Sequence, residues 1–287
     1  MPTYRLTLEY EGTRYRGWQE QKNARTVAAE LRRAIVAAGG GILQLGGAGR
    51  TDAGVHALGQ VAHLRLRAEV VPEPFRRAIN DALPADIHVA ALARAPEQFH
   101  ARHDALWRSY LYQIARRRTA LAKRHVWWVK RPLDVRRIEA AAARLTGRHD
   151  FASFCDSPGE QTSTIVVVDR LEIAEAGALL LVRIVASHFL WKMVRRIVGA
   201  LVRAGAGELS PDDLQRLLEG SLPAGAPEGT AAWTAPPSGL FLERVAYRGE
   251  PGPGPLLPAV PVSGEPPPDM PRPRPAGRPA RARGPAR

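Results

Sequence analysis

Cysteine is almost absent from this sequence, and long apolar runs are missing altogether. Cys155 is the only cysteine among 287 residues, which excludes an intramolecular disulfide and a zinc site built from several cysteines. No apolar run approaches the roughly 18 residues that cross a bilayer, and residues 1–6 lack the apolar core of a signal peptide. We therefore expect a soluble, cytoplasmic protein with no membrane partner.

Acidic residues are also in short supply. There are 28 Asp and Glu against 41 Lys and Arg, which leaves a net charge of +13. A charge of that sign and size favours a polyanionic partner, either nucleic acid or an acidic membrane surface. A general preference for arginine over lysine would explain the choice of basic residue, but less easily the excess of basic over acidic residues.

Two apolar periods along the chain predict alternating strands and helices. Apolar and polar residues alternate over residues 4–10, as in a strand with one buried face. Val27, Leu31 and Ile35 follow the helical period after Thr26, a favourable N-cap. The expected strands are 4–10, 60–67, 87–93, 108–114, 164–173, 179–186 and 240–248, and the expected helices are 27–38, 72–83, 134–146, 188–204 and 211–219.

The order of these elements is similar in the two parts of the chain. We predict two ferredoxin-like α+β halves, residues 1–105 and 106–250, with a cleft between them. From residue 251 the composition shifts to Pro, Gly, Ala and Arg without apolar periodicity, so residues 251–287 are expected to form a disordered basic tail.

A glycine-rich stretch, residues 46–57 with the sequence GGAGRTDAGVHA, carries the most informative residues. Its glycines permit sharp turns and a close approach to a ligand, with Asp52 in the middle. A phosphate-binding P-loop would need Lys and Ser or Thr after the last glycine, and a dinucleotide-binding loop would need a different glycine spacing. A surface turn in which Asp52 caps a backbone N–H is the plain alternative.

Basic and aromatic residues mix in two further segments. Residues 12–19 include Arg14 and Trp18, and residues 116–118 are three consecutive arginines, Arg116, Arg117 and Arg118. Guanidinium groups pair with phosphates and aromatic rings stack on bases, so these segments are candidate RNA contacts. Equally, Trp18 could cover the edge of the core, and the arginines could be a solvated charge run.

Histidines offer only a weak case for a metal. His100, His103 and Asp104 lie close together in an apparent loop, but no further cluster of ligands accompanies them. We predict no metal site.

At least four separated motifs resemble the bacterial tRNA pseudouridine synthase A family. They include G-R-T-D-A-G-V-H-A at residues 49–57, R-x-Y-x-Y at residues 108–112, F-L-x-x-M-V-R at residues 189–195 and Y-x-G-W-Q at residues 15–19. The resemblance extends in order from about residue 4 to about residue 247. It implies the pseudouridine synthase fold, in which a continuous antiparallel sheet runs through both halves.

The same resemblance implies roles for individual residues. Asp52 would be the catalytic nucleophile, Arg195 its ion-paired partner, and Tyr110 the residue that packs on the target base and is a candidate for proton removal. Arg50 would help to flip the base or hold a phosphate, and His56 would contact the substrate or only fix the loop through a hydrogen bond. Trp191 departs from the histidine expected in the third motif.

By this resemblance, the substrate is tRNA, and uridines 38, 39 and 40 of its anticodon stem-loop are isomerised without a cofactor. The enzyme would act as a homodimer whose two subunits contact one tRNA. Two alternatives stay open, because the motif defines the chemistry and not the target position. One is a synthase of the same fold with other targets, and the other is a non-catalytic RNA-binding protein for which Asp52 is dispensable.

Overall fold

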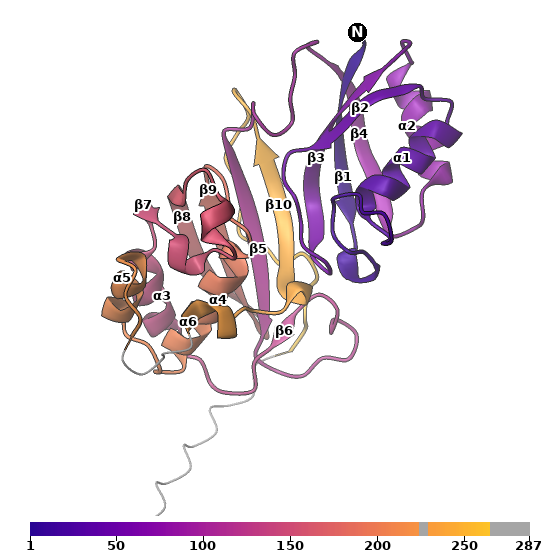
Figure 1. Cartoon of the computed structure of the whole chain (residues 1–287). Helices are drawn as coiled ribbons and strands as arrows, with labels where there is room; N and C mark the ends of the chain where they lie inside the picture. The colour runs from indigo at the N-terminus through magenta and orange to yellow at the C-terminus, as the bar shows by residue number, and fades with distance from the viewer. Residues whose placement is uncertain (224–228, 265–287) are drawn as a thin grey trace, which may run out of the picture.

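The computed structural model describes residues 1–223 and 229–264, and both halves of the chain contain strands and helices (Figure 1). The first half consists of β1 (Thr3–Tyr10), α1 (Val27–Ala37), β2 (Ile42–Gly47), β3 (His56–Leu66), α2 (Pro72–Ala82) and β4 (Ile87–Ala95). The second half consists of β5 (Trp107–Ala115), β6 (Trp127–Trp128), α3 (Val135–Arg144), β7 (Gly147–Asp150), β8 (Ile165–Ala176), β9 (Leu179–Ala186), α4 (Met193–Gly205), α5 (Pro211–Leu218), α6 (Gly229–Ala232) and β10 (Leu240–Ala246).

Side-chain caps define where several helices begin. The hydroxyl of Thr26 accepts a hydrogen bond from the backbone N–H of Ala29 at the start of α1, as the sequence predicts. Ser210 and Asp213 form a reciprocal capping box at α5. The predicted start of α4 at residue 188 is wrong, because Lys192 has a positive φ of 60° and the helix begins only at Met193.

One sheet runs through the molecule, in the order β4-β1-β3-β10-β5-β9-β8-β7, with β2 beside β3 and β6 beside β5. Within the first half the order is β4-β1-β3-β2, and β10-β5-β9-β8 repeats it in the second. This repetition confirms the predicted fold of two similar halves. The exact division between residues 105 and 106 stays a prediction.

The two halves join at β3 and β10. The last five residues of the long strand β3 pair with β2, while its first two, His56 and Ala57, pair with Phe241 and Leu242 of β10. The predicted continuous antiparallel sheet is confirmed, with two exceptions: this pairing and the short β5–β6 pairing are parallel. The four main strands of each half pair antiparallel, but the two strands that meet at the junction, β3 and β10, run in the same direction.

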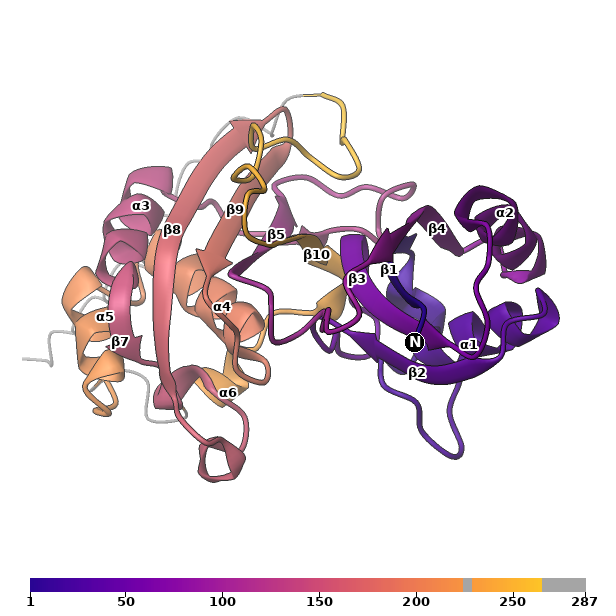
Figure 2. The same ribbon diagram turned by 90° about the horizontal axis from the view of Figure 1, so that it is seen from above.

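The main core lies between the sheet and the helices, and a smaller one lies on the other face. Tyr110 and Tyr112 of β5 belong to the main core, whereas Leu111 between them points into the small core. Figure 2 shows the segment after β10 crossing the sheet on the side away from α3 and α4. Within the described residues, no helix is long and apolar enough to cross a membrane.

The segment after β10, residues 251–264, is here called the C-terminal strap. Val262 is buried in the small core, Gln113 hydrogen-bonds the backbone of residues 259 and 260, and Arg183 donates to the carbonyls of Gly254 and Pro255. The prediction of a disordered tail from residue 251 is therefore wrong for the strap, whose apolar residues cover a sheet face. The rest of the predicted tail, residues 265–287, lies outside the described residues.

His63 of β3 is a buried histidine with an unusual pKa. Its Nδ1 accepts a hydrogen bond from the backbone N–H of Ala101 (3.2 Å), and its ring lies 4.4 Å from that of His100. Burial, with His100 as the next contribution, lowers the pKa of His63 to about 4. The ring is therefore neutral at physiological pH.

We expect the fold to lose stability as the pH falls from about 6.5 to about 4. Because the pKa of His63 in the folded chain is below its ordinary value of 6.5, the unfolded chain binds a proton in this interval that the folded chain does not. The neutral His63 makes its full contribution to the free energy of unfolding above pH 6.5. Up to about 3 kcal/mol of that free energy is lost by pH 4. Urea unfolding of wild type and His63→Gln between about pH 7 and 4.5 measures it. Parallel stability curves for the two proteins would contradict this assignment.

Candidate active site

The glycine-rich loop, residues 48–55, connects β2 to β3 directly at the junction of the two halves. The chain before α1 supports it at close range. The backbone N–H of Trp18 donates to the carbonyl of Thr51 (3.1 Å), and that of Val55 donates to the carbonyl of Asp52 (3.2 Å) to close a turn. Gly17 has a φ of +92°, and a Cβ there would lie 2.4 Å from the Thr51 oxygen. Only glycine allows the two segments to approach this closely.

Three buried polar side chains hold the loop, and the sequence indicates this role for none of them, although Arg108 begins the motif at residues 108–112. The hydroxyl of Tyr10 shares a hydrogen bond with that of Thr51 (2.8 Å). Gln60 donates to the carbonyl of Gly49 (2.9 Å), and Arg108 donates to that of Ala48 (3.2 Å). Residues 48, 49 and 51, shortly before Asp52, are therefore tied to three different strands, β5, β3 and β1.

Arg108 also connects the loop to the rest of the site. Its guanidinium group donates to the carbonyls of Arg102 (2.6 Å) and Ser187 (2.8 Å), so it joins the linker between the halves to the end of β9. Among the described residues, no carboxylate forms an ion pair with Arg108, and burial lowers the pKa of this guanidinium. Its positive charge therefore lies uncompensated behind the loop.

Asp52 and Arg195, 143 positions apart in sequence, form an ion pair across the two halves. Arg195 Nη1 lies 3.3 Å from Asp52 Oδ2, and the two side chains are 15% and 27% exposed. Arg195 lies in the first turn of α4, and its Nε donates to the carbonyl of Ala235 (2.7 Å), which fixes the guanidinium plane. Because Asp52 is partly exposed, a ligand can reach its carboxylate, while the hydrogen bond to Ala235 holds Arg195 in place.

Tyr110 of β5 lies beside the same loop. It is buried, its ring packs edge-on against Phe189 with centroids 4.8 Å apart, and a Cβ at Gly49 would lie 3.9 Å from its hydroxyl oxygen. Burial raises the pKa of Tyr110 well above its usual value, and Tyr10 and Asp52 add to the shift. Tyr110 is therefore a neutral phenol at physiological pH. A glycine-rich loop thus presents a carboxylate, held by an arginine, next to a buried tyrosine.

Comparison with known proteins decides what this arrangement is. A family model described as tRNA pseudouridine synthase matches residues 7–104 and 141–248. The chain belongs to the tRNA pseudouridine synthase family. This confirms the family expected from the motifs, and members of the family are isomerases.

Individual relatives of this synthase cover nearly all of its described part. It is 42% identical over 252 residues to the tRNA pseudouridine synthase A of Rhizobium meliloti (strain 1021), covering 86% of this chain and 100% of the relative. It is 43% identical over 250 residues to the same enzyme of Nitrobacter hamburgensis, with the same coverage. A protein from Galdieria sulphuraria with a solved structure is 11% identical, with a TM-score of 0.21 over 72% of this chain and 92% of that one, too distant to support an argument.

Two of the predicted RNA contacts of the synthase, Trp18 and His56, have buried rings in the structure. Trp18 is 3% exposed, and its indole lies against Gly47, where a Cβ would be 2.6 Å from the ring. His56 is 1% exposed at the start of β3. Trp18 is thus a core residue, as the alternative interpretation had it, and His56 offers no free face to RNA.

Four predicted arginine contacts differ in how free their side chains are. Arg14 and Arg50 are exposed, and neither forms an ion pair or a side-chain hydrogen bond among the described residues. Arg116 is paired with Glu175, and Arg117 donates to the carbonyl of Ser263 in the strap (3.1 Å). Only Arg14 and Arg50 are therefore available without breaking an existing contact.

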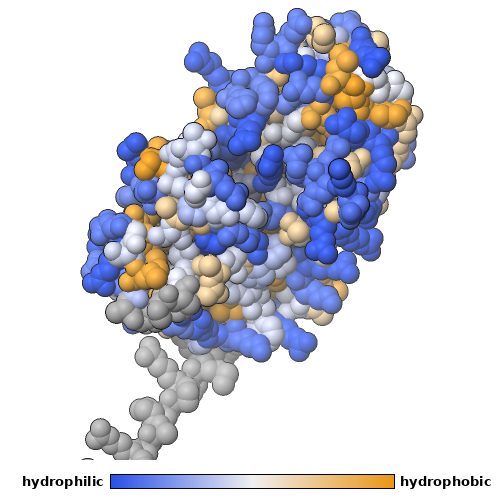
Figure 3. Space-filling view, in the orientation of Figure 1, coloured by the Kyte–Doolittle hydropathy of each residue, from blue (hydrophilic) through white to orange (hydrophobic). Residues whose placement is uncertain are grey.

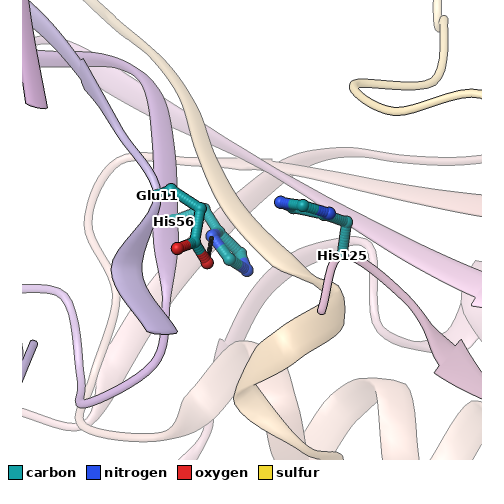
Figure 4. Close-up of side chains that lie close together, drawn as sticks. All are labelled: Glu11, His56 and His125. Atoms are coloured by element: carbon teal, nitrogen blue, oxygen red, sulfur yellow. Dashed lines mark ion pairs between the residues drawn. The ribbon is translucent and has the colours of Figure 1, made fainter. Parts of the chain in front are cut away.

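His56 also belongs to a group that could be mistaken for a metal site. Glu11, His56 and His125 point toward one another (Figure 4), and their ligand atoms lie within 4.8 Å of each other. Both nitrogens of His56 are already used, because Nδ1 accepts from the N–H of Gly12 (3.0 Å) and Nε2 donates to the carbonyl of Arg124 (2.9 Å). This tautomer leaves no lone pair for a cation. His56 therefore fixes the start of β3 through hydrogen bonds.

Proposed function

We propose that this synthase converts uridine to pseudouridine at positions 38, 39 and 40 of tRNA, in the anticodon stem-loop, with Asp52 as nucleophile. The observation that carries the proposal is the ion pair between Asp52 and Arg195, which brings two family motifs from opposite halves to one point. The family and its named relatives support tRNA as the substrate. The position within tRNA rests on the resemblance of the motifs.

The reaction requires that the N1–C1′ bond breaks and that uracil rejoins the sugar through C5. The carboxylate of Asp52 attacks C1′ and holds the sugar while the base turns. When C5 bonds to C1′, the bond to Asp52 breaks, the proton on C5 is removed and N1 takes up a proton. Composition is unchanged, so the reaction consumes no co-reactant.

The other residues of the site have supporting roles in this proposal. Arg195 keeps the carboxylate ionised and aimed at the sugar. Tyr110 packs on the target base and passes protons as a neutral phenol, in keeping with its raised pKa. Arg50, next but one to Asp52 and exposed, contacts the backbone of the flipped nucleotide, and Arg14 a phosphate farther out.

The net charge of +13 supports a polyanionic partner. Hydrophilic residues cover much of the face shown in Figure 3, and its larger apolar patches lie toward the two ends of the molecule. We further propose that the enzyme works in the cytoplasm as a homodimer, on the strength of the family resemblance. Sedimentation with and without tRNA measures the stoichiometry.

The direct test is to map pseudouridine by position in unmodified tRNA after incubation with the enzyme. Pseudouridine at 38, 39 and 40 is the expected result. Pseudouridine at other positions would support the proposed reaction but contradict the proposed target positions. Binding of tRNA without any product would favour the non-catalytic alternative.

Replacing Tyr110 with phenylalanine should lower kcat by roughly 10²-fold or more, the usual contribution of a positioned proton-transfer group. The ring and its packing on Phe189 are retained, so the KM for tRNA should change little. Tyr112→Phe is the matched control on the same strand and face. It loses a hydrogen bond to the carbonyl of Pro236 and should cost about 1 kcal/mol of stability without loss of kcat. Equal kcat values for Tyr110→Phe and wild type would exclude a role for the hydroxyl.

A further inference from the structure

The turn between β9 and α4 exposes a large aromatic side chain beside the active site. Trp191 is 47% exposed. It lies two residues after Phe189, which packs on Tyr110, and four residues before Arg195, which pairs with Asp52. Trp18 and Trp233, by contrast, are 3% and 6% exposed. Trp191 is therefore an accessible indole that is close in sequence to two residues of the site.

The backbone at this turn is held in an unfavourable conformation. Lys192 has a φ of 60° and a ψ of 3°, in the left-handed region that a residue with a side chain rarely adopts. Such conformations persist only where the surroundings enforce them, and they concentrate at functional sites.

Asp156 provides that enforcement. Its backbone N–H donates to the carbonyl of Trp191 (2.9 Å), and its carboxylate forms ion pairs with Lys192 and, at 2.8 Å, with Arg196. The hydrogen bond from Lys192 lowers the pKa of this carboxyl, so it stays ionised over a wide pH range. Asp156 thus contacts the turn at Trp191, at Lys192 and at Arg196, and the Trp191 ring stays exposed.

An exposed ring in this place suits an unpaired nucleobase. If the enzyme acts on RNA as proposed above, the target uridine must leave its stack, which exposes the faces of the neighbouring bases. Proteins bind such bases by stacking aromatic side chains on them, largely without regard to sequence. Lys192 Nζ lies 5.0 Å from the centre of the Trp191 ring. Because Lys192 and Arg196 share the single carboxylate of Asp156, this group of side chains keeps a net positive charge near the ring.

We propose that Trp191 stacks on a nucleobase of the RNA loop adjacent to the flipped uridine, and that Asp156 positions it by clamping the turn. This inference rests on the proposed function and adds a substrate contact to it. Trp191 binds RNA and takes no part in the bond changes at C1′.

The test compares Trp191→Ala and Trp191→Phe with wild type, using unmodified tRNA. Trp191→Ala should raise the Kd and the KM for tRNA by roughly 5- to 100-fold, as the loss of one stacked base predicts. Its kcat at saturating tRNA should stay within about 3-fold of wild type. Trp191→Phe, which keeps an aromatic face, should recover most of the affinity. Leu257→Ala is the control for trimming an exposed apolar side chain, because Leu257 is 64% exposed on the strap, across the sheet from the helices.

Several outcomes would overturn the inference. Unchanged KM and Kd in Trp191→Ala would do so, as would an equal effect of Leu257→Ala. A Trp191→Ala variant that weakens self-association instead of RNA affinity would show that a second copy of the chain covers the ring. A wild type that forms no pseudouridine refutes the proposed function as well, whereas an active wild type with an unaffected Trp191→Ala refutes this inference alone.

Discussion

Replacing Asp52 with asparagine should lower kcat by roughly 10⁴-fold or more, the largest effect expected from any single substitution here. Asparagine has nearly the same shape but cannot attack C1′ as a carboxylate does. The ion pair with Arg195 is replaced by a weaker polar contact, while the loop keeps its ties through Thr51, Gly49 and Ala48. Single-turnover formation of pseudouridine under excess enzyme measures the chemical step directly.

Two controls separate this loss from misfolding and from loss of binding. Asp52→Asn should bind tRNA within a few-fold of wild type, because the carboxylate contributes negative charge and no attraction for phosphate. Asp169→Asn changes an exposed carboxylate on β8 that pairs with its neighbour Arg170, and should leave kcat unchanged. Turnover by Asp52→Asn near the wild-type rate would show that Asp52 is not the nucleophile. Asp52 would then be a residue that only caps the loop.

The sequence predicts the residues of the site better than it predicts their surroundings. Asp52 and Arg195 lie in motifs with distinctive residue types, and the structure brings the two side chains to 3.3 Å. His56 lies in the same motif as Asp52, and Trp18 lies in the basic and aromatic segment of residues 12–19, but both rings are buried. A motif identifies the residue type at a position, but only the packing around that position shows whether the side chain is buried in the core or available to the substrate.

Strand β2 and the strap show why some elements escape local patterns. Residues 42–47 form a strand although they end in two glycines, because the long partner β3 supplies their hydrogen bonds. The strap has no apolar period, yet Val262 and the backbone at residues 259 and 260 find partners on β5 and the small core. In both cases the deciding contacts come from residues distant in sequence.

The same reason hides the support of the loop. Tyr10 and Gln60 are strand residues whose alternation predicts only that one face is buried. That their polar groups meet Thr51 and Gly49 follows from the pairing of β1 with β3 beneath the loop. Arg108 is an arginine in a strand, and the sequence does not indicate that its four donors would serve backbone carbonyls.

Replacing Arg195 with methionine should lower kcat by roughly 10²- to 10³-fold, the cost of removing one preorganised charged group from an active site. Methionine fills much of the same volume but leaves the carboxylate of Asp52 without its counter-charge and frees the carbonyl of Ala235. Arg195→Lys should lie between the two, because it keeps the charge but cannot make both contacts. Single-turnover rates for the three proteins give the comparison.

Arg183→Met is the matched control, since it also removes a largely buried guanidinium that pairs with a carboxylate, here Glu243 on the far side of the sheet. Breaking that pair should cost about 3–5 kcal/mol of stability and leave kcat intact at temperatures where the variant is folded. Because Arg195 acts through Asp52, the double variant Asp52→Asn/Arg195→Met should be hardly slower than Asp52→Asn alone. Fully additive losses would mean that Arg195 stabilises the reacting RNA directly, and the ion pair would then be a feature of the free enzyme only.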